Sequence, residues 1–334
     1  MKLIITNLPS FYKINLYNRI NERIKIYVIF TGDTASIRNK DFFEGEIRFN
    51  YSHLSSDAIY RKVFEFINIL HQNKFEELII GGWDSIYMWL AAFFPCSSKK
   101  SVVIESSILE SNTSGFKGFL KKFFLFRIAV AYVSGQSQKE LLHALNFKGK
   151  CITTKGVGIF NVRSQPKFEE KNAVTNFLYV GRLSPEKNLQ FLIETFNQLP
   201  YLTLNIVGFG PQEDFLKSIG GNNIIFHGAI PNAQLYDTYR KNDVFILPSI
   251  SEPWGMVVEE ALNNGLPIIV SDRVGCAAEI INQTNGLIFD LKDPEGLKKS
   301  IVKMLDINYY NNLRENISKL NFEEIAEEQV KCYL

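Results

Sequence analysis

The chain has 334 residues, which is too long for one ordinary hydrophobic core and suggests two domains. Apolar residues make up 46% of the chain and charged residues 22%, a composition typical of globular proteins. Because 37 Lys and Arg residues nearly balance 35 Asp and Glu residues, the overall charge gives no reason to expect a nucleic-acid partner.

The chain shows no segment typical of export or membrane insertion. The first apolar run ends before Thr6, which is shorter than the core of a signal peptide, and no stretch approaches the roughly 18 apolar residues of a membrane span. The four cysteines, Cys96, Cys151, Cys276 and Cys332, lack CxxC spacing and predict neither a zinc site nor a disulfide framework. We therefore expect reduced thiols and a cytoplasmic protein.

Apolar runs in the first half predict the buried strands of an α/β domain over residues 1–165. These runs are KLIIT (2–6), KIYVIF (25–30), ELIIGG (77–82), SVVIES (101–106) and AVAYVSG (129–135). Residues 57–73 have helical spacing between the second and third runs. Residues 161–176 are polar, contain Pro and lack periodicity, so they predict a linker.

Strands alternate with helices more clearly in the second half, which we assign to a domain over residues 172–316. Strands are predicted at 176–183, 202–210, 223–230, 244–249, 267–272 and 286–290. Helices are predicted at 185–199, 232–243, after Gly255, and at 293–305. This alternation is typical of parallel strands with right-handed crossovers, in a doubly wound α/β fold. Residues 317–334 form a further amphipathic helix, expected to cross back to the first domain.

Two cations flank the strand end at 181–188, GRLSPEKN. Arg182 follows the strand and Lys187 lies near the start of the predicted helix, where Ser184 and Pro185 suit the cap and first position. Unpaired N–H groups at a helix start favour anions, and ligands of doubly wound sheets bind at the carboxyl ends of strands. The pattern predicts a diphosphate site. The alternative is two solvated surface cations, which would show the same sequence pattern.

Gly208 and Gly210 follow the next strand. Such a GxG would let the backbone approach a phosphate, but it is equally a tight turn between strand and helix. Glu252 and Glu260 lie on either side of the start of the next helix. Carboxylates accept hydrogen bonds from paired hydroxyl groups, as on sugars and riboses. The alternatives are a capping role for Glu252 and an exposed position for Glu260.

Four stretches of the second half resemble the donor-binding half of the family 4 glycosyltransferases, which have the GT-B fold. They are GRLSPEKN (181–188), IVGFGP (206–211), FILPSISEPWGMVVEEALNNGLPIIVSDRVGCAAEII (245–281) and NGLIF (285–289). The resemblance implies two Rossmann-like doubly wound domains facing a central cleft. It also implies a retaining reaction that needs no metal and no cofactor besides the nucleotide-sugar donor. The chain contains no D-x-D pair.

Glu252 and Glu260 match the E-x7-E element of that family. The resemblance implies that Arg182 and Lys187 bind the donor diphosphate, that Glu252 contacts the transferred sugar, and that Glu260 binds the ribose. Backbone N–H groups that would help hold the phosphate belong to Gly255, Met256 and Val257.

The first half resembles one subgroup of the family over NLPSFYKINLYNRI (7–20), IIGGWD (79–84) and VVIESS (102–107). The resemblance places Trp83 and Asp84 on the acceptor side. Glu105 stands where many relatives have a histidine that faces the acceptor, so the chain departs from the pattern there. Glu105 becomes a candidate for orienting the acceptor.

Residues 115–127, GFKGFLKKFFLFR, combine four cations with five Phe and two Leu. A helix over 116–127 could lie on an anionic membrane surface, or its aromatic face could be ordinary core. Because Gly115 and Gly118 weaken a helix start, we expect the amphipathic part at 119–127. A surface role would make the protein peripheral on the cytoplasmic face of the membrane.

We therefore expect a retaining glycosyltransferase that moves a sugar from a nucleotide-sugar donor to a glycan or lipid-linked acceptor, in bacterial surface polysaccharide synthesis. Two alternatives stay open. One is a sugar-nucleotide epimerase of the same architecture, which would convert the donor without an acceptor. The other is a catalytically silent subunit that binds nucleotide sugars. Donor hydrolysis without acceptor would distinguish an active transferase from a silent subunit.

Overall fold

The computed structural model describes residues 1–32, 40–54 and 58–334, and the side chains of these residues apart from 40 and 41. The described chain divides into two compact units. Unit 1 comprises Met1–Phe160 together with Ile325–Leu334, and unit 2 comprises Asn161–Glu324.

Unit 1 is built on a parallel sheet of seven strands, in the order β3-β2-β1-β4-β5-β6-β7. Its strands are β1 (Lys2–Thr6), β2 (Ile26–Phe30), β3 (Asn50–His53), β4 (Glu77–Ile80), β5 (Lys99–Ile104), β6 (Val130–Val133) and β7 (Lys150–Thr153). Its helices are α1 (Phe11–Arg23), α2 (Ile59–Gln72), α3 (Ile86–Phe93), α4 (Gly115–Leu125) and α5 (Gln136–Ala144), with a 3₁₀ turn at Lys40–Phe43. Helix α13 (Phe322–Lys331) brings the C-terminus to this unit.

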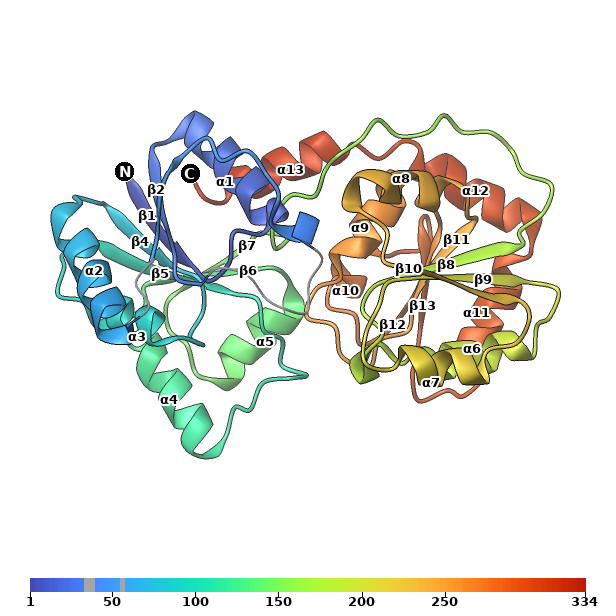
Figure 1. Ribbon diagram of the computed structural model, residues 1–334, viewed down its shortest axis with the longest axis horizontal. Coiled ribbons are helices and arrows are strands. Elements are labelled where there is room, and N and C mark those ends of the chain that lie inside the picture. The colour runs from blue at the N-terminus through green and yellow to red at the C-terminus, as the bar shows by residue number, and fades with distance from the viewer. Residues whose placement is uncertain (33–39, 55–57) are drawn as a thin grey trace. The chain divides into compact units, whose positions relative to one another are not determined.

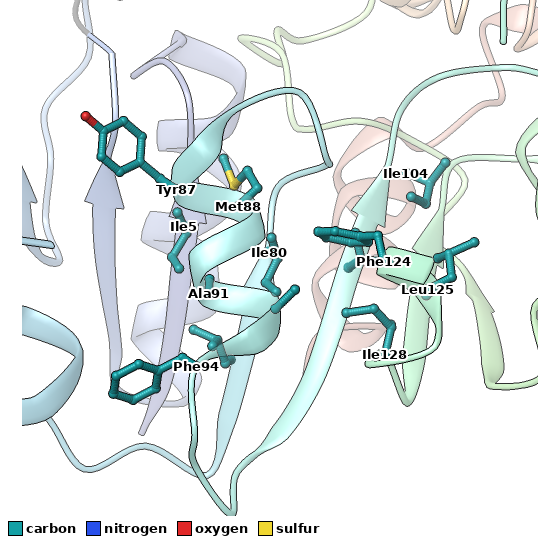
Figure 2. Packing of buried hydrophobic residues seen from close by; sticks show 14 of the residues in the cluster. Ile5, Ile80, Tyr87, Met88, Ala91, Phe94, Ile104, Phe124, Leu125 and Ile128 are labelled. Atoms are coloured by element: carbon teal, nitrogen blue, oxygen red, sulfur yellow. The ribbon is translucent and has the colours of Figure 1, made fainter. Parts of the chain in front are cut away.

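Helices cover both faces of this sheet, as Figure 1 shows for α1 and for α3, α4 and α5. On one face, Figure 2 shows Met88 and Ala91 of α3 beside Ile5 and Ile80 of the sheet. On the other, Tyr333 stacks on Tyr132 of β6 with ring centroids 4.6 Å apart. Since both faces are buried, the central strands are continuous apolar runs.

Unit 2 has a parallel sheet of six strands, in the order β10-β9-β8-β11-β12-β13. Its strands are β8 (Asn176–Val180), β9 (Thr203–Val207), β10 (Ile224–Gly228), β11 (Val244–Leu247), β12 (Ile268–Ser271) and β13 (Gly286–Phe289). Its helices are α6 (Leu189–Asn197), α7 (Glu213–Ile219), α8 (Asn232–Arg240), α9 (Met256–Asn263), α10 (Ala277–Ile280), α11 (Gly296–Met304) and α12 (Ile307–Ile317). The expected fold class, two doubly wound parallel sheets with helices, is confirmed (Figure 1).

The residues predicted to link the domains belong to unit 2 and pack onto it. The backbone N–H of Arg163 donates to Asn263 Oδ1 at 2.9 Å, and Asn263 Nδ2 donates back to the Arg163 carbonyl at 2.9 Å. Lys171 pairs with the buried carboxylate of Asp243, which also accepts the N–H groups of Thr175 and Asn176. The polar composition of this segment therefore reflects an irregular strap fixed by hydrogen bonds.

Candidate active site

The strand order of unit 2 reverses between β8 and β11, so the loops that follow these two strands diverge from neighbouring points on one edge of the sheet. In doubly wound folds this switch point is where ligands bind. The two loops are tied together: Ile250 N–H donates to the Glu186 carbonyl at 2.9 Å, and Asn188 Nδ2 donates to the Pro248 carbonyl at 3.2 Å. All the predicted donor-site charges except Glu260 lie on these two loops.

Lys187 and Glu252 form an ion pair across the switch point, joining the loop after β8 to the loop after β11. The two side chains are only 12% and 14% exposed. An ammonium and a carboxylate that are largely removed from water each require a partner, and each supplies the other here. The structure thus brings into direct contact two residues that the sequence placed in one site.

The position of Lys187 differs from the expected one. The sequence predicted one helix starting at Pro185, but residues Pro185–Lys187 form a short 3₁₀ turn and α6 begins only at Leu189. Asn188 separates the two with a left-handed backbone, at φ 58°. Asn tolerates this conformation better than most residues because its short polar side chain can bond locally. Lys187 therefore precedes a helix N-terminus and does not lie within the first turn of that helix.

Arg182, the second predicted cation, pairs with Glu186 at 3.0 Å. The same carboxylate accepts a hydrogen bond from Ser184 Oγ at 2.6 Å. Burial acts to raise the pKa of Glu186, but the Ser184 hydrogen bond and the nearby cations outweigh it, and the pKa is lowered. Sequence reasoning missed Glu186. Both site cations thus have carboxylate partners, and a diphosphate would compete with those partners for them.

The loop that carries Glu252 is fixed by its own backbone. Glu252 N–H donates to the Arg273 carbonyl at 3.2 Å, and Gly275 N–H donates to the Glu252 carbonyl at 2.8 Å. A Cβ atom on Gly275 would lie 1.9 Å from the Pro253 carbonyl oxygen, so only glycine permits this approach. Gly255 then reverses the chain at φ 97° and caps α9. Since α9 begins at Met256 and Val258 N–H donates to the Gly255 carbonyl at 2.9 Å, the N–H groups of Met256 and Val257 are the ones at this helix start without a carbonyl one turn earlier.

Glu259, for which sequence reasoning proposed no role, is a buried acid behind this loop. Its Oε2 accepts the indole N–H of Trp254 at 2.8 Å, and both residues are buried. Burial raises the pKa of Glu259 to about 8, although the Trp254 hydrogen bond acts in the opposite direction. The pair anchors the turn between Glu252 and α9 to the body of the helix.

Glu260 lies on α9 and is half-buried. The alternative of an exposed position for this acid therefore does not hold. Its Oε2 accepts the hydroxyl of Tyr239, from α8, at 3.0 Å. Burial raises the pKa of Glu260 to about 7, while the Tyr239 hydrogen bond lowers it. The carboxyl keeps acceptor capacity beyond this one bond, as a ribose-binding group requires.

Gly208 and Gly210 serve the packing of two strand-end loops. A Cβ on Gly208 would lie 1.8 Å from the Gly181 carbonyl oxygen, and one on Gly210 would lie 2.4 Å from the Leu183 carbonyl oxygen. Gly208 also has a left-handed backbone at φ 134°. Of the two interpretations left open, the tight turn is a sufficient reason for both glycines. Their close approach also fixes the loop that carries Arg182.

Unit 1 has its own switch point, between β1 and β4. There Asn7, after β1, donates its amide to Asp84 Oδ2, after β4, at 2.8 Å. Trp83 packs edge-on against Phe124 of α4 and lies under the ammonium of Lys121 at 5.3 Å. The two predicted acceptor-side residues thus diverge: Asp84 belongs to the switch point and Trp83 to the packing of α4.

Glu105, after β5, pairs with Lys13 of α1 at 2.8 Å. Lys13 also donates to Thr6 Oγ1 at 3.3 Å. Burial acts to lower the pKa of Lys13, but the Glu105 carboxylate raises it well above its usual range. The carboxyl of Glu105 is 39% exposed, so it retains free access for a further partner while its charge is balanced.

The five phenylalanines of residues 115–127, four in α4 and Phe126 directly after it, divide between core and surface. Phe124 is fully buried, and Figure 2 shows it beside Leu125 and Ile128. The other four, Phe116, Phe119, Phe123 and Phe126, are 75%, 61%, 49% and 82% exposed. The helix also begins at Gly115 and not at residue 119 as expected. Gly118 is needed there because a Cβ would lie 2.2 Å from the Thr113 carbonyl oxygen.

We call these four phenylalanines, with the exposed cations Lys117, Lys122 and Arg127, the α4 surface.

No helix in residues 1–32, 40–54 and 58–334 is long and apolar enough to cross a membrane. Across those same ranges, no group of three or more His, Cys, Asp or Glu side chains could hold a metal ion.

The chain is similar to known glycosyltransferases in sequence. Residues 161–322 match the family described as Glycosyl transferases group 1. O-antigen biosynthesis glycosyltransferase WbnH of Escherichia coli is 27% identical over 95% of this chain and 91% of its own length. Sulfoquinovosyl transferase SQD2 of Arabidopsis thaliana is 32% identical over 44% of this chain, and the match spans only 29% of that relative.

Solved structures match both units. Sucrose-phosphate synthase from Thermosynechococcus elongatus has a TM-score of 0.76 at 18% identity, covering 99% of this chain and 98% of its own. Anabaena HepE, solved with UDP and glucose, has a TM-score of 0.73 at 14% identity, covering 98% and 97%. These likenesses establish the GT-B fold. The match over residues 161–322 covers just under half of the chain, and the relationship to WbnH covers nearly all of it, so the chain is similar in sequence to glycosyltransferases, one of them of O-antigen biosynthesis.

Proposed function

We propose that the chain transfers a sugar from a nucleotide-sugar donor to a glycan or lipid-linked acceptor, with retention at the anomeric carbon. The observation that carries the donor half is the Lys187–Glu252 pair at the switch point of unit 2. A ligand with a diphosphate and sugar hydroxyls presents a partner for each of these two groups. The solved complex of HepE with UDP and glucose supports this class of ligand.

In the proposed reaction, the bond between the anomeric carbon and the diphosphate oxygen breaks while the acceptor oxygen bonds to the same face of that carbon. The leaving phosphate oxygen takes the acceptor proton. Arg182, Lys187 and the N–H groups of Met256 and Val257 stabilise the charge that grows on the diphosphate. Such preorganised donors are each worth about 3 kcal/mol in a transition state.

Glu252 accepts sugar hydroxyls once Lys187 turns to the phosphate, and Glu260 accepts those of the ribose. No step in this scheme uses a metal. Acceptor recognition is assigned to unit 1, with Asp84 and Glu105 as polar contacts, while Trp83 contributes to the packing of α4. Glu105 would orient the acceptor hydroxyl, with Lys13 as its ion-pair partner.

The α4 surface is proposed to contact an anionic membrane. Four exposed phenylalanines and three exposed cations, on α4 and the two residues after it, fit the boundary between acyl chains and anionic headgroups. The charge-balanced remainder of the chain would not supply this attraction, because its cations and acids nearly cancel. A lipid-linked acceptor would then be encountered at the surface to which the protein binds.

A panel of nucleoside diphosphates and nucleotide sugars, tested by thermal shift with magnesium and with a chelator, examines the donor site. A ligand that binds the folded state raises the melting temperature by mass action. We expect a shift with one nucleotide family, equal with and without magnesium, and release of free nucleotide from the matching sugar donor. No shift with any nucleotide would contradict the proposal. A shift without release of free nucleotide would favour a silent subunit. Isomerised donor without release would favour an epimerase.

A further inference from the structure

An apolar groove of about 440 Å³ opens on the surface of unit 1, between α2 and α3. Its lining residues are Ile67, Leu70, His71, Ile86, Trp89, Leu90, Phe93, Phe94 and Pro95. The volume falls within the range of small-molecule sites, roughly 300–1,000 Å³. Exposed apolar hollows of this kind are uncommon on folded proteins without a ligand or partner. The groove is therefore a candidate binding site.

The lining carries few polar groups, namely the indole N–H of Trp89 and the imidazole of His71, which is at an exposed position. The indole N–H of Trp89 donates to the Trp83 carbonyl at 2.9 Å. His71 packs its ring edge-on against Phe94, with centroids 4.9 Å apart. The groove thus offers hydrocarbon contact and little hydrogen bonding, which fits an alkyl or isoprenoid chain better than a sugar or nucleotide.

The groove is continuous with the α4 surface. Phe93, which lines the groove, stacks on Phe123 of α4 with centroids 4.9 Å apart. The guanidinium of Arg127 lies 5.9 Å from the Phe93 ring centroid. Helix α4 contains no acidic residue. Along this helix, the charged side chains beside the groove are therefore all cations. An occupant with an apolar chain and an anionic group would meet complementary chemistry at both ends.

We infer that this groove binds one hydrocarbon chain of an anionic lipid, whose headgroup pairs with Arg127 and the lysines of α4. The inference rests on the proposed membrane contact of the α4 surface and extends it, because it names a site for an individual lipid molecule. Each methylene withdrawn from water should strengthen binding about fourfold. Affinity is therefore expected to rise with chain length until the groove is filled.

The test uses the full chain and short-chain phosphatidylglycerols below their micelle concentration, followed by titration calorimetry. Dioctanoyl-phosphatidylglycerol should bind more tightly than the dihexanoyl form by tenfold or more, and glycerol phosphate without chains should not bind detectably. Tryptophan emission should change on binding in the wild type and not in Trp89→Phe, since Trp89 lines the groove. Equal affinity for the two chain lengths would overturn the inference.

Ile86→Glu places a charge in the groove at a residue that is 52% exposed, so the fold should tolerate it. Ile86→Glu should reduce the affinity for dioctanoyl-phosphatidylglycerol by tenfold or more. Ile86→Leu, which keeps an apolar side chain there, should bind this lipid with the wild-type affinity. Val302→Glu, at an equally exposed apolar residue of α11, is the matched control. Unchanged lipid affinity in Ile86→Glu would place the lipid elsewhere and overturn the inference. Equal binding of dioctanoyl-phosphatidylcholine would overturn its anionic part.

Failure of this inference is distinguishable from failure of the proposed function. Sedimentation with vesicles of phosphatidylglycerol reports the α4 surface, and nucleotide thermal shifts report unit 2. If the wild type sediments with vesicles and shifts with nucleotide, yet binds no short-chain lipid, only the groove inference is wrong. The predicted result for Ile86→Glu is loss of short-chain binding while the nucleotide shift stays at the wild-type value.

Discussion

Trp254 donates its indole N–H to the carboxyl of Glu259 at 2.8 Å, and this bond connects the Glu252 loop to the helix that carries Glu260. Both partners are buried. Among the residues that the structure describes, no cation pairs with Glu259, so this buried acid favours its protonated form. The consequence is a pH-dependent stability of unit 2.

Stability of unit 2 should fall as pH rises between about 4.3 and 8. Burial raises the pKa of Glu259 to about 8, and that of an unfolded Glu is about 4.3. Between these values the folded state keeps a proton that the unfolded state has lost, and linkage then lowers stability with increasing pH. Glu259→Gln removes this titration. Urea unfolding at several pH values should give a flatter profile in the variant than in the wild type.

The slope should be reduced and not abolished, because Glu260 has a pKa raised to about 7 and titrates with the same sign. Glu194→Gln, at an exposed acid of α6, is the control and should leave the profile unchanged. A wild-type profile in Glu259→Gln would mean that Glu259 is ionised in the folded protein.

Nucleoside diphosphate affinity should weaken as pH falls below about 7. If Glu260 accepts ribose hydroxyls as a carboxylate, protonation with a pKa of about 7 removes acceptor capacity. The Tyr239 hydrogen bond lowers this pKa, so Tyr239→Phe should move the midpoint of the affinity profile to higher pH. Calorimetry across pH 5.5–8.5 measures the midpoint. This range extends about one and a half pH units on either side of the pKa of about 7.

Tyr236→Phe, on the same helix, is a matched control that leaves Glu260 untouched. Its midpoint should equal that of the wild type. If the midpoint in Tyr239→Phe equals that of the wild type, the pH dependence belongs to another group, such as the nucleotide itself.

Lys187→Ala should weaken nucleoside diphosphate binding tenfold or more and lower turnover by about 10²–10³, as loss of a preorganised charge donor does. It also leaves Glu252 largely buried without its cation, which should destabilise unit 2. In the double variant Lys187→Ala, Glu252→Gln, part of that stability should return because the unpaired charge is gone. Nucleotide affinity should not return. Thermal unfolding with and without nucleotide separates the two effects.

Lys217→Ala removes an exposed cation of α7 that pairs with Glu213 at 2.7 Å, and it serves as the control. Exposed pairs contribute about 0–1 kcal/mol, so little change is expected in either measurement. Wild-type nucleotide affinity in Lys187→Ala would remove Lys187 from the donor site.

The sequence predicted the strands that are buried on both faces and the edge strands of unit 2, and it missed the polar strands at the edges of the unit 1 sheet. Ile268–Ser271 is a continuous apolar run because helices cover both sides of it. The missed strands, Asn50–His53 and Lys150–Thr153, are the two edges of the unit 1 sheet. Their side chains are mostly exposed or half-buried, so they need no apolar run and leave no periodic signal.

The site was predictable in its residue types and not in its pairings. Strand ends and spacing placed Arg182, Lys187 and Glu252 on one sheet edge, because parallel strands bring their carboxyl ends together. That Lys187 contacts Glu252, 65 residues away, depends on loop paths that no local pattern specifies. Glu259 was overlooked because an acid beside another acid is usually exposed, whereas here the tertiary fold buries it against Trp254.

Gly208→Ala should destabilise unit 2 by about 3 kcal/mol or more, since it combines backbone overlap with left-handed strain. The added Cβ would lie 1.8 Å from the Gly181 carbonyl oxygen, at φ 134°. Gly228→Ala isolates the strain alone, because φ is 67° there and the space is open. Its cost should be about 1–2 kcal/mol. Equal losses in the two variants, by chemical denaturation, would mean that the loop after β8 moves away readily.

Phe119→Ser with Phe126→Ser should abolish sedimentation with phosphatidylglycerol vesicles and leave the melting temperature unchanged. Both side chains are more than half exposed, so their removal opens no cavity. The wild type should also lose vesicle binding as salt increases, because the cations of α4 act through screened attraction. Phe215→Ser with Tyr201→Ser, at exposed aromatics of unit 2, is the control. If both double variants bind vesicles as the wild type does, the aromatic residues of α4 do not mediate the contact. If binding persists at high salt but fails in the α4 variant, apolar insertion alone carries it.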